Sequence, residues 1–379
     1  MIRKYLKVRE DTEQICIGLS EQELSNQPRT EVSPAKWHLG HTTWFFEKII
    51  LEKHSENYQC FKNDYDFVFN SYYKQIGKHV NQSDRGEIDI ESSDILDYRK
   101  YVDEMMIALL DSIQDSSQDS SQDREIKSLL QIGLNHEQQH QELLHMDIKS
   151  VFFSLNKNYP LAIKQQDNSN EGWLSIPEGL NECGLNEGEN SDEDFCFDNE
   201  QPLHKHYQYS TKISHSLVTN AQYSEFITSG GYSNPKYWLS KGWDWVEHNT
   251  ITHPLYWNDS LASESPVAHI SYFEADAYAN WIGCRLPTEF EHEYFDQLTK
   301  TPSALWSWTS SQYSAYPGFQ KFNGALSEYS GKFMCNQFVL RGGCIATPQG
   351  HWRPSYRNFY EPHQRWLYSG IRLAKDDNQ

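Results

Sequence analysis

Apolar residues recur at helical spacing through about the first 155 residues of the chain, and this period is then lost. The longest periodic stretches are residues 32–51, 93–113 and 125–155, and a spacing near 3.6 residues predicts amphipathic helices. We therefore expect four helices joined by one long connection, residues 55–91, which is long enough to form a binding loop. The polar repeat of residues 111–123 is expected to be a solvated excursion between two helices.

Beyond about residue 165, short segments punctuated by Gly, Pro and Asn replace the helical period, which is typical of short strands and loops. Helices are expected within this half at residues 220–228, 273–282 and 289–298. A chain of 379 residues also exceeds the usual size of a single hydrophobic core. The pattern predicts an α+β protein of two domains, a four-helix bundle at residues 1–160 and an irregular α+β domain at residues 161–379.

The chain has 33 basic and 53 acidic residues and a formal net charge of -20 at pH 7. This charge argues against nucleic acid and acidic membranes as partners, because both require a basic surface. No apolar run approaches the roughly 20 residues of a membrane span, and the first residues lack the apolar core of a signal peptide. Seven cysteines without CxxC spacing predict reduced thiols. We expect a cytoplasmic protein that acts on small molecules, and its oligomeric state stays open.

The segment NHEQQHQELLHMD places His136 and His140 four residues apart. On a helix, side chains at this spacing leave the same face one turn apart, so the two imidazoles can hold one metal ion. The same letters satisfy the HExxH pattern of zinc hydrolases, with Glu137 as the general base. The pair alone therefore leaves zinc hydrolysis and iron or copper oxygen chemistry open.

A third ligand is expected from the upstream segment KWHLGHTTWFFE, which contains His38 and His41. His41 lies in line with the aromatic residues Trp37 and Trp44, so it is the better candidate for an inward-facing ligand. His38 remains the alternative, because residue chemistry alone does not separate the two.

Two sets of motifs resemble the ergothioneine-biosynthesis sulfoxide synthases. SPAKWHLGHTTWFFE, FNSYY and HEQQHQELL are similar to the DinB-like half of these enzymes. LVTNAQYSEFI, CRLPTEFEHEY and VLRGGCIATPQGHWRPSYRNFY are similar to their formylglycine-generating-enzyme (sulfatase-modifying factor) domain, which has a C-type-lectin-like fold. The resemblance implies Fe(II) on His41, His136 and His140. It also implies O2 as co-substrate, with sulfur of a thiol joined to C2 of the hercynine imidazole and oxidised to a sulfoxide.

The resemblance assigns roles to further residues. Gln139 is expected to contact the substrate imidazole. Tyr72 and Tyr73 are expected at the active site, where a phenol can donate a proton. Arg85 is expected to bind the carboxylate of an amino-acid thiol through its fork of N–H donors.

In the C-terminal segment SYRNFYEP, Asn358 and Phe359 match the positions that bind hercynine, and an aromatic ring suits its quaternary ammonium group. Relatives that use γ-glutamylcysteine have Asp and Arg in this segment, where this chain has Tyr360 and Gln364. The departure favours free cysteine as the sulfur donor.

Other functions remain open from the sequence. The same fold would suit a selenoneine-type synthase that uses a selenosugar, or an ovothiol-type synthase that acts on unmethylated histidine. A zinc hydrolase using HEQQH and a non-catalytic ligand-binding protein of lectin type are the alternatives from other classes.

Overall fold

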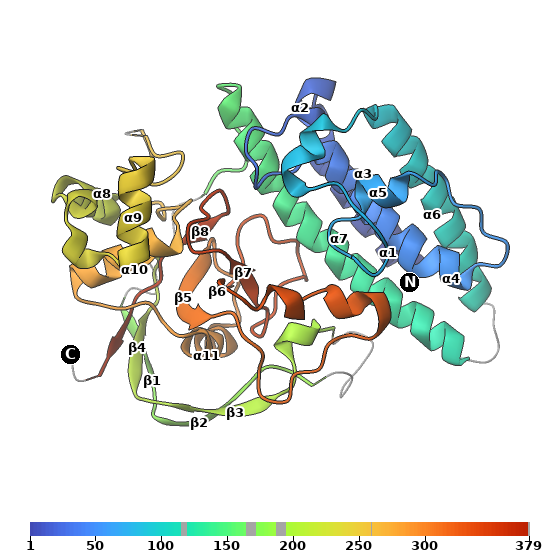
Figure 1. Cartoon of the computed structure of the whole chain (residues 1–379). Coiled ribbons are helices and arrows are strands. Elements are labelled where there is room, and N and C mark those ends of the chain that lie inside the picture. Colours follow the sequence, from blue (N-terminus) through green and yellow to red (C-terminus); the bar gives the residue numbers. More distant parts are fainter. Residues whose placement is uncertain (115–119, 164–171, 187–194, 259, 378–379) are drawn as a thin grey trace. The chain divides into compact units, whose positions relative to one another are not determined.

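A computed structural model of the chain describes residues 1–114, 120–163, 172–186, 195–258 and 260–377 (Figure 1). The chain divides into two compact units. Unit 1 comprises Met1–Pro160 and Asn323–Glu328, and unit 2 comprises Leu161–Phe322 and Tyr329–Gln379. Residues 161–379 were expected to form one domain, whereas the short segment Asn323–Glu328 joins unit 1. There the backbone N–H of Gln75 donates to Glu328 Oε2 at 3.1 Å.

Unit 1 is helical. Its elements are α1 (Ile2–Cys16), α2 (Glu21–Ser25), α3 (Ala35–Phe46), the π-helical turn η1 (Glu47–Leu51), α4 (Glu52–His54), α5 (Tyr65–Phe69), the 3₁₀ turn η2 (Gln82–Glu87), α6 (Ser92–Gln114) and α7 (Ser121–Ser154). The four long helices α1, α3, α6 and α7 account for the expected bundle. The elements α5 and η2 lie in the long connection. Residues 115–119 of the expected polar excursion lie outside the described residues.

Two of the long helices, α7 and α3, begin at residues that favour the start of a helix. Ser120 accepts the backbone N–H of Asp123 at 3.0 Å, and the Asp123 carboxylate accepts the N–H of Ser120 at 3.0 Å. This capping box satisfies two of the orphan donors of α7, so the helix begins at Ser121, ahead of the expected residue 125. Helix α3 begins directly after Pro34, because a residue that precedes proline is disfavoured in helical conformation.

Helix α7 lies against both α1 and α3 (Figure 1). Ala35, Leu144 and Ile148 form a buried apolar cluster between α3 and α7. Further along the same pair, a Cβ on Gly133 would lie 2.6 Å from the Phe46 ring. The glycine thus permits a close approach of the two helices that carry the candidate metal ligands.

Within its described residues, unit 2 contains three small sheets and four α-helices. Its strands are β1 (Trp173–Ile176), β2 (Gly179–Cys183), β3 (His204–Gln208), β4 (Thr211–Ser214), β5 (Trp306–Gln312), β6 (Phe338–Arg341), β7 (Asn358–Tyr360), β8 (Ser369–Gly370) and β9 (Ala374–Asp376). The sheets have the orders β1-β4-β9, β2-β3 and β7-β6-β5-β8, and all pairs are antiparallel except β5 with β8.

The helices of unit 2 are α8 (Asn220–Thr228), α9 (Ser240–Asn249), α10 (Tyr272–Ile282) and α11 (Glu289–Thr299). Three of them match expected helices, while α9 was not expected. Ile176, Ile213 and Phe295 form a buried cluster where α11 packs on β1 and β4. The expected α+β fold of two domains is confirmed. Among the described residues, no helix is both long and apolar enough to cross a membrane.

Candidate metal centre

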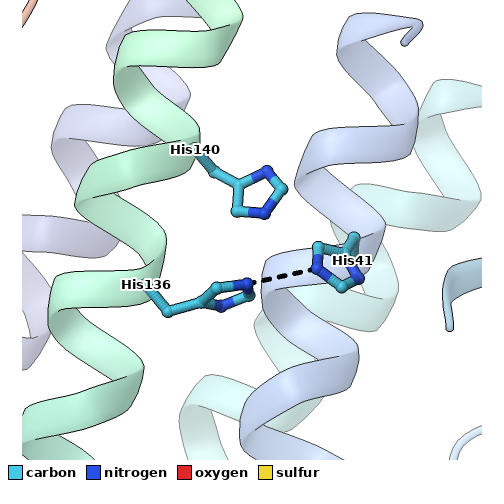
Figure 2. Close-up of side chains that lie close together, drawn as sticks. All are labelled: His41, His136 and His140. Carbon is cyan, nitrogen blue, oxygen red and sulfur yellow. Dashed lines mark hydrogen bonds between the residues drawn. The ribbon is translucent and has the colours of Figure 1, made fainter. Parts of the chain in front are cut away.

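Three buried histidines converge inside unit 1. Figure 2 shows the rings of His136 and His140 extending from α7 toward His41 on α3. One ring nitrogen from each residue can be chosen so that all three lie within 4.8 Å of one another. His41 Nε2 and His136 Nε2 are 3.2 Å apart. The structure thus brings together the three residues that were expected to bind the metal.

All three imidazoles are held in the neutral form. Burial lowers the pKa of His136 to about 3. Burial also lowers the pKa of His41 and of His140 well below the ordinary value, and the positive charge that His136 would carry if protonated adds to the effect on both. A neutral imidazole has the free lone pair that a metal requires. The cluster is therefore poised to bind a cation near neutral pH.

The spacing between the donor atoms fits coordination of one ion. With a metal–nitrogen bond of about 2.1 Å, neighbouring donors lie about 3.0 Å apart at a right angle and about 3.4 Å apart at the tetrahedral angle. The 3.2 Å between His41 Nε2 and His136 Nε2 falls between these values. An all-imidazole set suits iron, copper or zinc, so the distances do not choose the metal.

His41 is fixed by contacts on several sides. Its Nδ1–H donates to the carbonyl oxygen of Phe69 at 2.6 Å, which leaves Nε2 with the lone pair. The ring stacks on Trp37 with centroids 4.6 Å apart and on Trp44 with centroids 5.8 Å apart. A Cβ at Gly40 would lie 2.1 Å from the Phe69 ring, so glycine is needed there for Phe69 to approach.

His38 is not part of the cluster. Its Nδ1 lies 2.8 Å from His140 Nδ1, and its Nε2 lies 2.9 Å from Asp147 Oδ2. Both ring nitrogens are therefore engaged away from the position that the three other histidines surround. The arrangement favours His41 over His38 as the third ligand.

Glu137 does not face the histidine cluster as a general base would. Its carboxylate is fully buried and accepts hydrogen bonds from Arg9 Nη1 at 2.8 Å and from Arg99 Nη2 at 3.0 Å. The same arginines donate to Thr43 at 2.9 Å and to Thr42 at 3.1 Å on α3. A carboxylate neutralised by two guanidinium groups is a poor proton acceptor. Glu137 is therefore unsuited to act as the general base that the HExxH motif of a zinc hydrolase requires.

Arg85 supplies a buried positive charge beside the cluster. Its Cζ lies 3.4 Å from the centroid of the Trp37 ring, and its Nη1 donates to Ser33 Oγ at 2.8 Å. Among the residues that the structure describes, Arg85 forms no ion pair and its Nε has no hydrogen-bond partner. Burial lowers the pKa of Arg85 to about 9, and the charge of Asp147 opposes this effect. A desolvated guanidinium of this kind favours binding of an anion.

Tyr72 and Tyr73 are presented by a tight turn after α5. The Asn70 side chain accepts the backbone N–H of Tyr73 at 2.9 Å and donates to its carbonyl at 3.0 Å. Tyr73 is fully buried against Trp44, whereas Tyr72 is partly exposed. The hydroxyl of Tyr72 donates to that of Tyr73 at 3.5 Å. Through Trp44, the tyrosine pair adjoins His41.

The remaining expected site residues have different surroundings. Gln139 is half-buried on α7, between the paired histidines. Asn358 and Phe359 are half-buried on β7 in unit 2, where the Phe359 ring stacks on Tyr313 with centroids 4.0 Å apart.

Several residues around the cluster were not expected from the sequence. Arg9 and Arg99 bond to Glu137 on α7 but lie far from it along the chain. Asp147 lies on α7 and bonds to His38 on α3, but it belongs to no recognised motif. Only Asp147 gave a signal, because it lies seven residues after His140 and therefore on the same helical face.

Two family models match the chain. The model of the DinB superfamily matches residues 4–144, and the model of the sulfatase-modifying factor enzyme 1-like domain matches residues 159–295. A hercynine oxygenase of Mycolicibacterium smegmatis is 26% identical to this chain, and the match covers 95% of each protein. A hercynine oxygenase of Mycobacterium tuberculosis is 30% identical over 49% of this chain and 57% of its own length. Ergothioneine biosynthesis protein 1 of Schizosaccharomyces pombe is 27% identical over 54% of this chain and 31% of its own length.

Each half of the chain therefore matches its own family, and the order of the halves agrees with the order expected from the motifs. The chain is therefore similar to proteins in which a DinB superfamily domain precedes a sulfatase-modifying factor enzyme 1-like domain, in agreement with the resemblance of its motifs to the ergothioneine-biosynthesis sulfoxide synthases.

Proposed function

We propose that this protein is an enzyme of ergothioneine biosynthesis that uses Fe(II) and O2 to join the sulfur of cysteine to C2 of the hercynine imidazole as a sulfoxide. The supporting observation is the cluster of three neutral, buried imidazoles with an unpaired guanidinium beside it. The match to a hercynine oxygenase along nearly the whole chain agrees with it. In the overall reaction O2 is fully reduced, since one oxygen atom enters the sulfoxide and the other leaves as water.

His41, His136 and His140 would hold the iron through Nε2. Three protein ligands leave open positions, and the bound iron would supply the activation of O2 next to the sulfur. The protein contributes the neutral donor set and the dry surroundings of Trp37 and Trp44. Burial at this site keeps water from competing for the reactants.

Arg85 would bind the carboxylate of cysteine. A buried guanidinium without an acidic partner gains a charge-assisted, two-pronged pair with a carboxylate. Free cysteine places a carboxylate a few bonds from its thiol, so one contact fixes the position of the sulfur. Lysine lacks the planar fork, and we expect it to replace Arg85 poorly.

Tyr72 and Tyr73 would deliver a proton during reduction of O2, because their hydroxyls form one hydrogen-bonded pair next to Trp44. Gln139 would contact the substrate imidazole from α7. From unit 2, we propose on the resemblance that Asn358 and Phe359 bind hercynine. The Phe359 ring stacks on Tyr313, and its centroid lies 6.0 Å from that of the Phe333 ring; a group of aromatic rings suits a quaternary ammonium group.

The experiment is turnover of hercynine and cysteine by the full chain. The protein is purified anaerobically, loaded with Fe(II) and exposed to O2, and the products are identified by mass spectrometry. We expect the hercynine–cysteine sulfoxide, with one oxygen atom derived from labelled O2. The variant His136→Ala should give no product, whereas His145→Ala should retain it. His145 lies on the same helix but bonds to Tyr159, outside the cluster.

The outcomes separate the alternatives. Turnover of histidine in preference to hercynine would indicate an ovothiol-type enzyme, and turnover of a selenosugar in preference to cysteine would indicate a selenoneine-type enzyme. Activity with zinc alone, or no turnover of hercynine with any thiol, would refute the proposal.

A further inference from the structure

A hydrogen-bonded chain runs from the histidine cluster to a buried carboxylate. It begins at His140, continues through His38 and ends at Asp147, with distances of 2.8 Å and 2.9 Å. All three side chains are buried, and Asp147 also accepts the backbone N–H of Ser33 at 2.8 Å. The comparisons assign no role to His38 or Asp147, and the sequence offered His38 only as an alternative metal ligand.

The chemistry of the partners indicates an order for the protons. A carboxylate only accepts hydrogen bonds, so His38 Nε2 carries a proton and donates a hydrogen bond to Asp147. When His38 carries no second proton, its Nδ1 keeps a lone pair, and the contact of 2.8 Å then makes His140 Nδ1 the donor. His140 is left with its lone pair on Nε2, which is the atom that faces the cluster.

We propose that His38 and Asp147 are positioning residues that hold His140 in the Nδ1–H form and so present its Nε2 to a metal ion. The proposal rests on the proposed metal site. His38 itself does not bind the ion, because binding would break one of its two hydrogen bonds.

The hydrogen bonds from His140 through His38 to Asp147 also make His140 differ from His41 in its outer hydrogen-bond partner. His41 donates its Nδ1–H to the neutral carbonyl of Phe69. His140 donates instead to an imidazole that is itself bonded to a carboxylate, which draws the shared protons toward Asp147. A partner of this kind increases the basicity of the opposite ring nitrogen. We therefore expect His140 to be the strongest donor of the three and the most sensitive to changes outside the cluster.

Two substitutions perturb the chain in different ways. His38→Ala removes the acceptor of the His140 proton. Asp147→Asn keeps the shape and the acceptor, because the Oδ2 that accepts from His38 also accepts the backbone N–H of Ser33 and the amide oxygen takes its place. It removes the negative charge that draws the shared protons toward residue 147, so the basicity of His140 Nε2 falls. Loss of such outer hydrogen bonds typically costs about 10- to 100-fold in metal affinity.

The first measurement uses the metal-free wild-type protein with ¹⁵N-labelled histidine. Two-dimensional NMR of the ring nitrogens should show His140 protonated on Nδ1 and His38 protonated on Nε2. The His38 signals are assigned by their loss in His38→Ala, and the His140 signals by their loss in His140→Ala. A wild-type protein with His140 protonated on Nε2 would overturn the proposal, and this result does not depend on whether a metal binds.

The second measurement is titration of the metal-free full chain with Co(II), followed by its visible absorption. We expect Asp147→Asn and His38→Ala to weaken binding by about 10- to 100-fold and to alter the spectrum, while Asp147→Glu restores part of the affinity. The control His145→Ala should bind as the wild type does.

The two measurements distinguish a failure of the positioning role of His38 and Asp147 from a failure of the proposed metal site. Unchanged affinity and spectrum in folded Asp147→Asn and His38→Ala would overturn the positioning role while leaving the metal site intact. A wild-type protein that binds neither Co(II) nor Fe(II) would overturn the metal site, together with the role proposed for the chain.

Discussion

Replacement of Glu137 by Gln tests whether this residue acts in stability or in catalysis. The carboxylate has no exposed surface and lies between Arg9 on α1 and Arg99 on α6. Gln has the same shape, but it removes the negative charge and turns one hydrogen-bond acceptor into a donor that faces a guanidinium group. The perturbation is therefore confined to the ion network.

The expected loss of unfolding free energy depends on which carboxylate partners Arg9 and Arg99 keep in the variant. Removing one partner of a buried ion pair costs about 3–5 kcal/mol. Arg9 keeps Asp103 at 2.7 Å and Arg99 keeps Glu13 at 3.1 Å, so neither cation is left without a carboxylate. We therefore expect Glu137→Gln to lower the free energy of unfolding by about 3 kcal/mol, the lower end of this range. For a unit of this size, this loss corresponds to a fall in melting temperature of about 6–12 °C.

The loss should depend on pH. Burial alone would raise the pKa of Glu137, but the charges of Arg9 and Arg99 outweigh it and hold the pKa below its ordinary value. A depressed carboxyl pKa stabilises the folded state above the unfolded value of about 4.3, and this stability is lost as the pH falls through the folded pKa. The wild type and Glu137→Gln should therefore differ fully at pH 7 and converge in acid.

The assay is calorimetric melting of the full chain at pH 7 and at pH 4 and below. Glu125→Gln is the matched control, because Glu125 lies on the same helix with 63% of its side chain exposed and should change stability by less than about 0.5 kcal/mol. A Glu137→Gln protein that melts like the wild type but loses metal-dependent hydrolysis would refute the structural role and return Glu137 to that of a base.

Three further predictions concern single positions. Gly40→Ala should destabilise the protein by about 1–3 kcal/mol in chemical denaturation, because its Cβ would overlap the Phe69 ring; an unchanged midpoint would contradict the close packing. Burial raises the pKa of Asp276 to about 6. Its ionisation therefore opposes folding as the pH rises through that value, and Asp276→Asn should raise stability at pH 7 by about 1 kcal/mol and have no effect below pH ~4. Arg85→Lys should raise the KM for cysteine by about 10- to 100-fold without changing that for hercynine; equal effects on both would contradict its selectivity for the thiol substrate.

Local signals in the sequence were sufficient for most helices. The expected residues 220–228 coincide with α8, since Thr219 accepts the N–H of Gln222 at 3.3 Å and forms a capping box with it. Helix α9 was missed because it begins after Leu239, which offers no side-chain cap, and because its residues include a glycine and two tryptophans. Helix α9 makes contacts such as that between the rings of Trp245 and Phe273, whose centroids are 5.9 Å apart, and no local pattern reveals such contacts.

The candidate site was predictable only where its residues repeat along one helix. His136 and His140 are neighbours by spacing, whereas the choice between His38 and His41 needed their positions in the fold. The Glu137 partner Arg99 and the His38 partner Asp147 are 38 and 109 residues away. Contacts over such distances depend on how the helices pack, and a single sequence contains no signal for them.

The candidate metal ligands on α7 and the residues that pack in the bundle lie on different faces of the helix. With about 100° per residue, His136, His140 and Asp147 fall within about 40° of one another. Glu137 lies roughly 100° to one side, toward α1 and α6, and Gln139 lies roughly 60° to the other.

The neighbours of each face agree with this division. Gln141, which follows Glu137 by one turn, donates to Val8 O at 2.9 Å and Thr12 Oγ1 at 3.0 Å on α1. That face holds the bundle together, whereas Gln139 lies outside it and is half-buried. The motif HEQQHQ therefore combines a face that carries two candidate metal ligands with a face that packs in the bundle. Substitutions at Glu137 should lower stability first, and substitutions at Gln139 should affect turnover first.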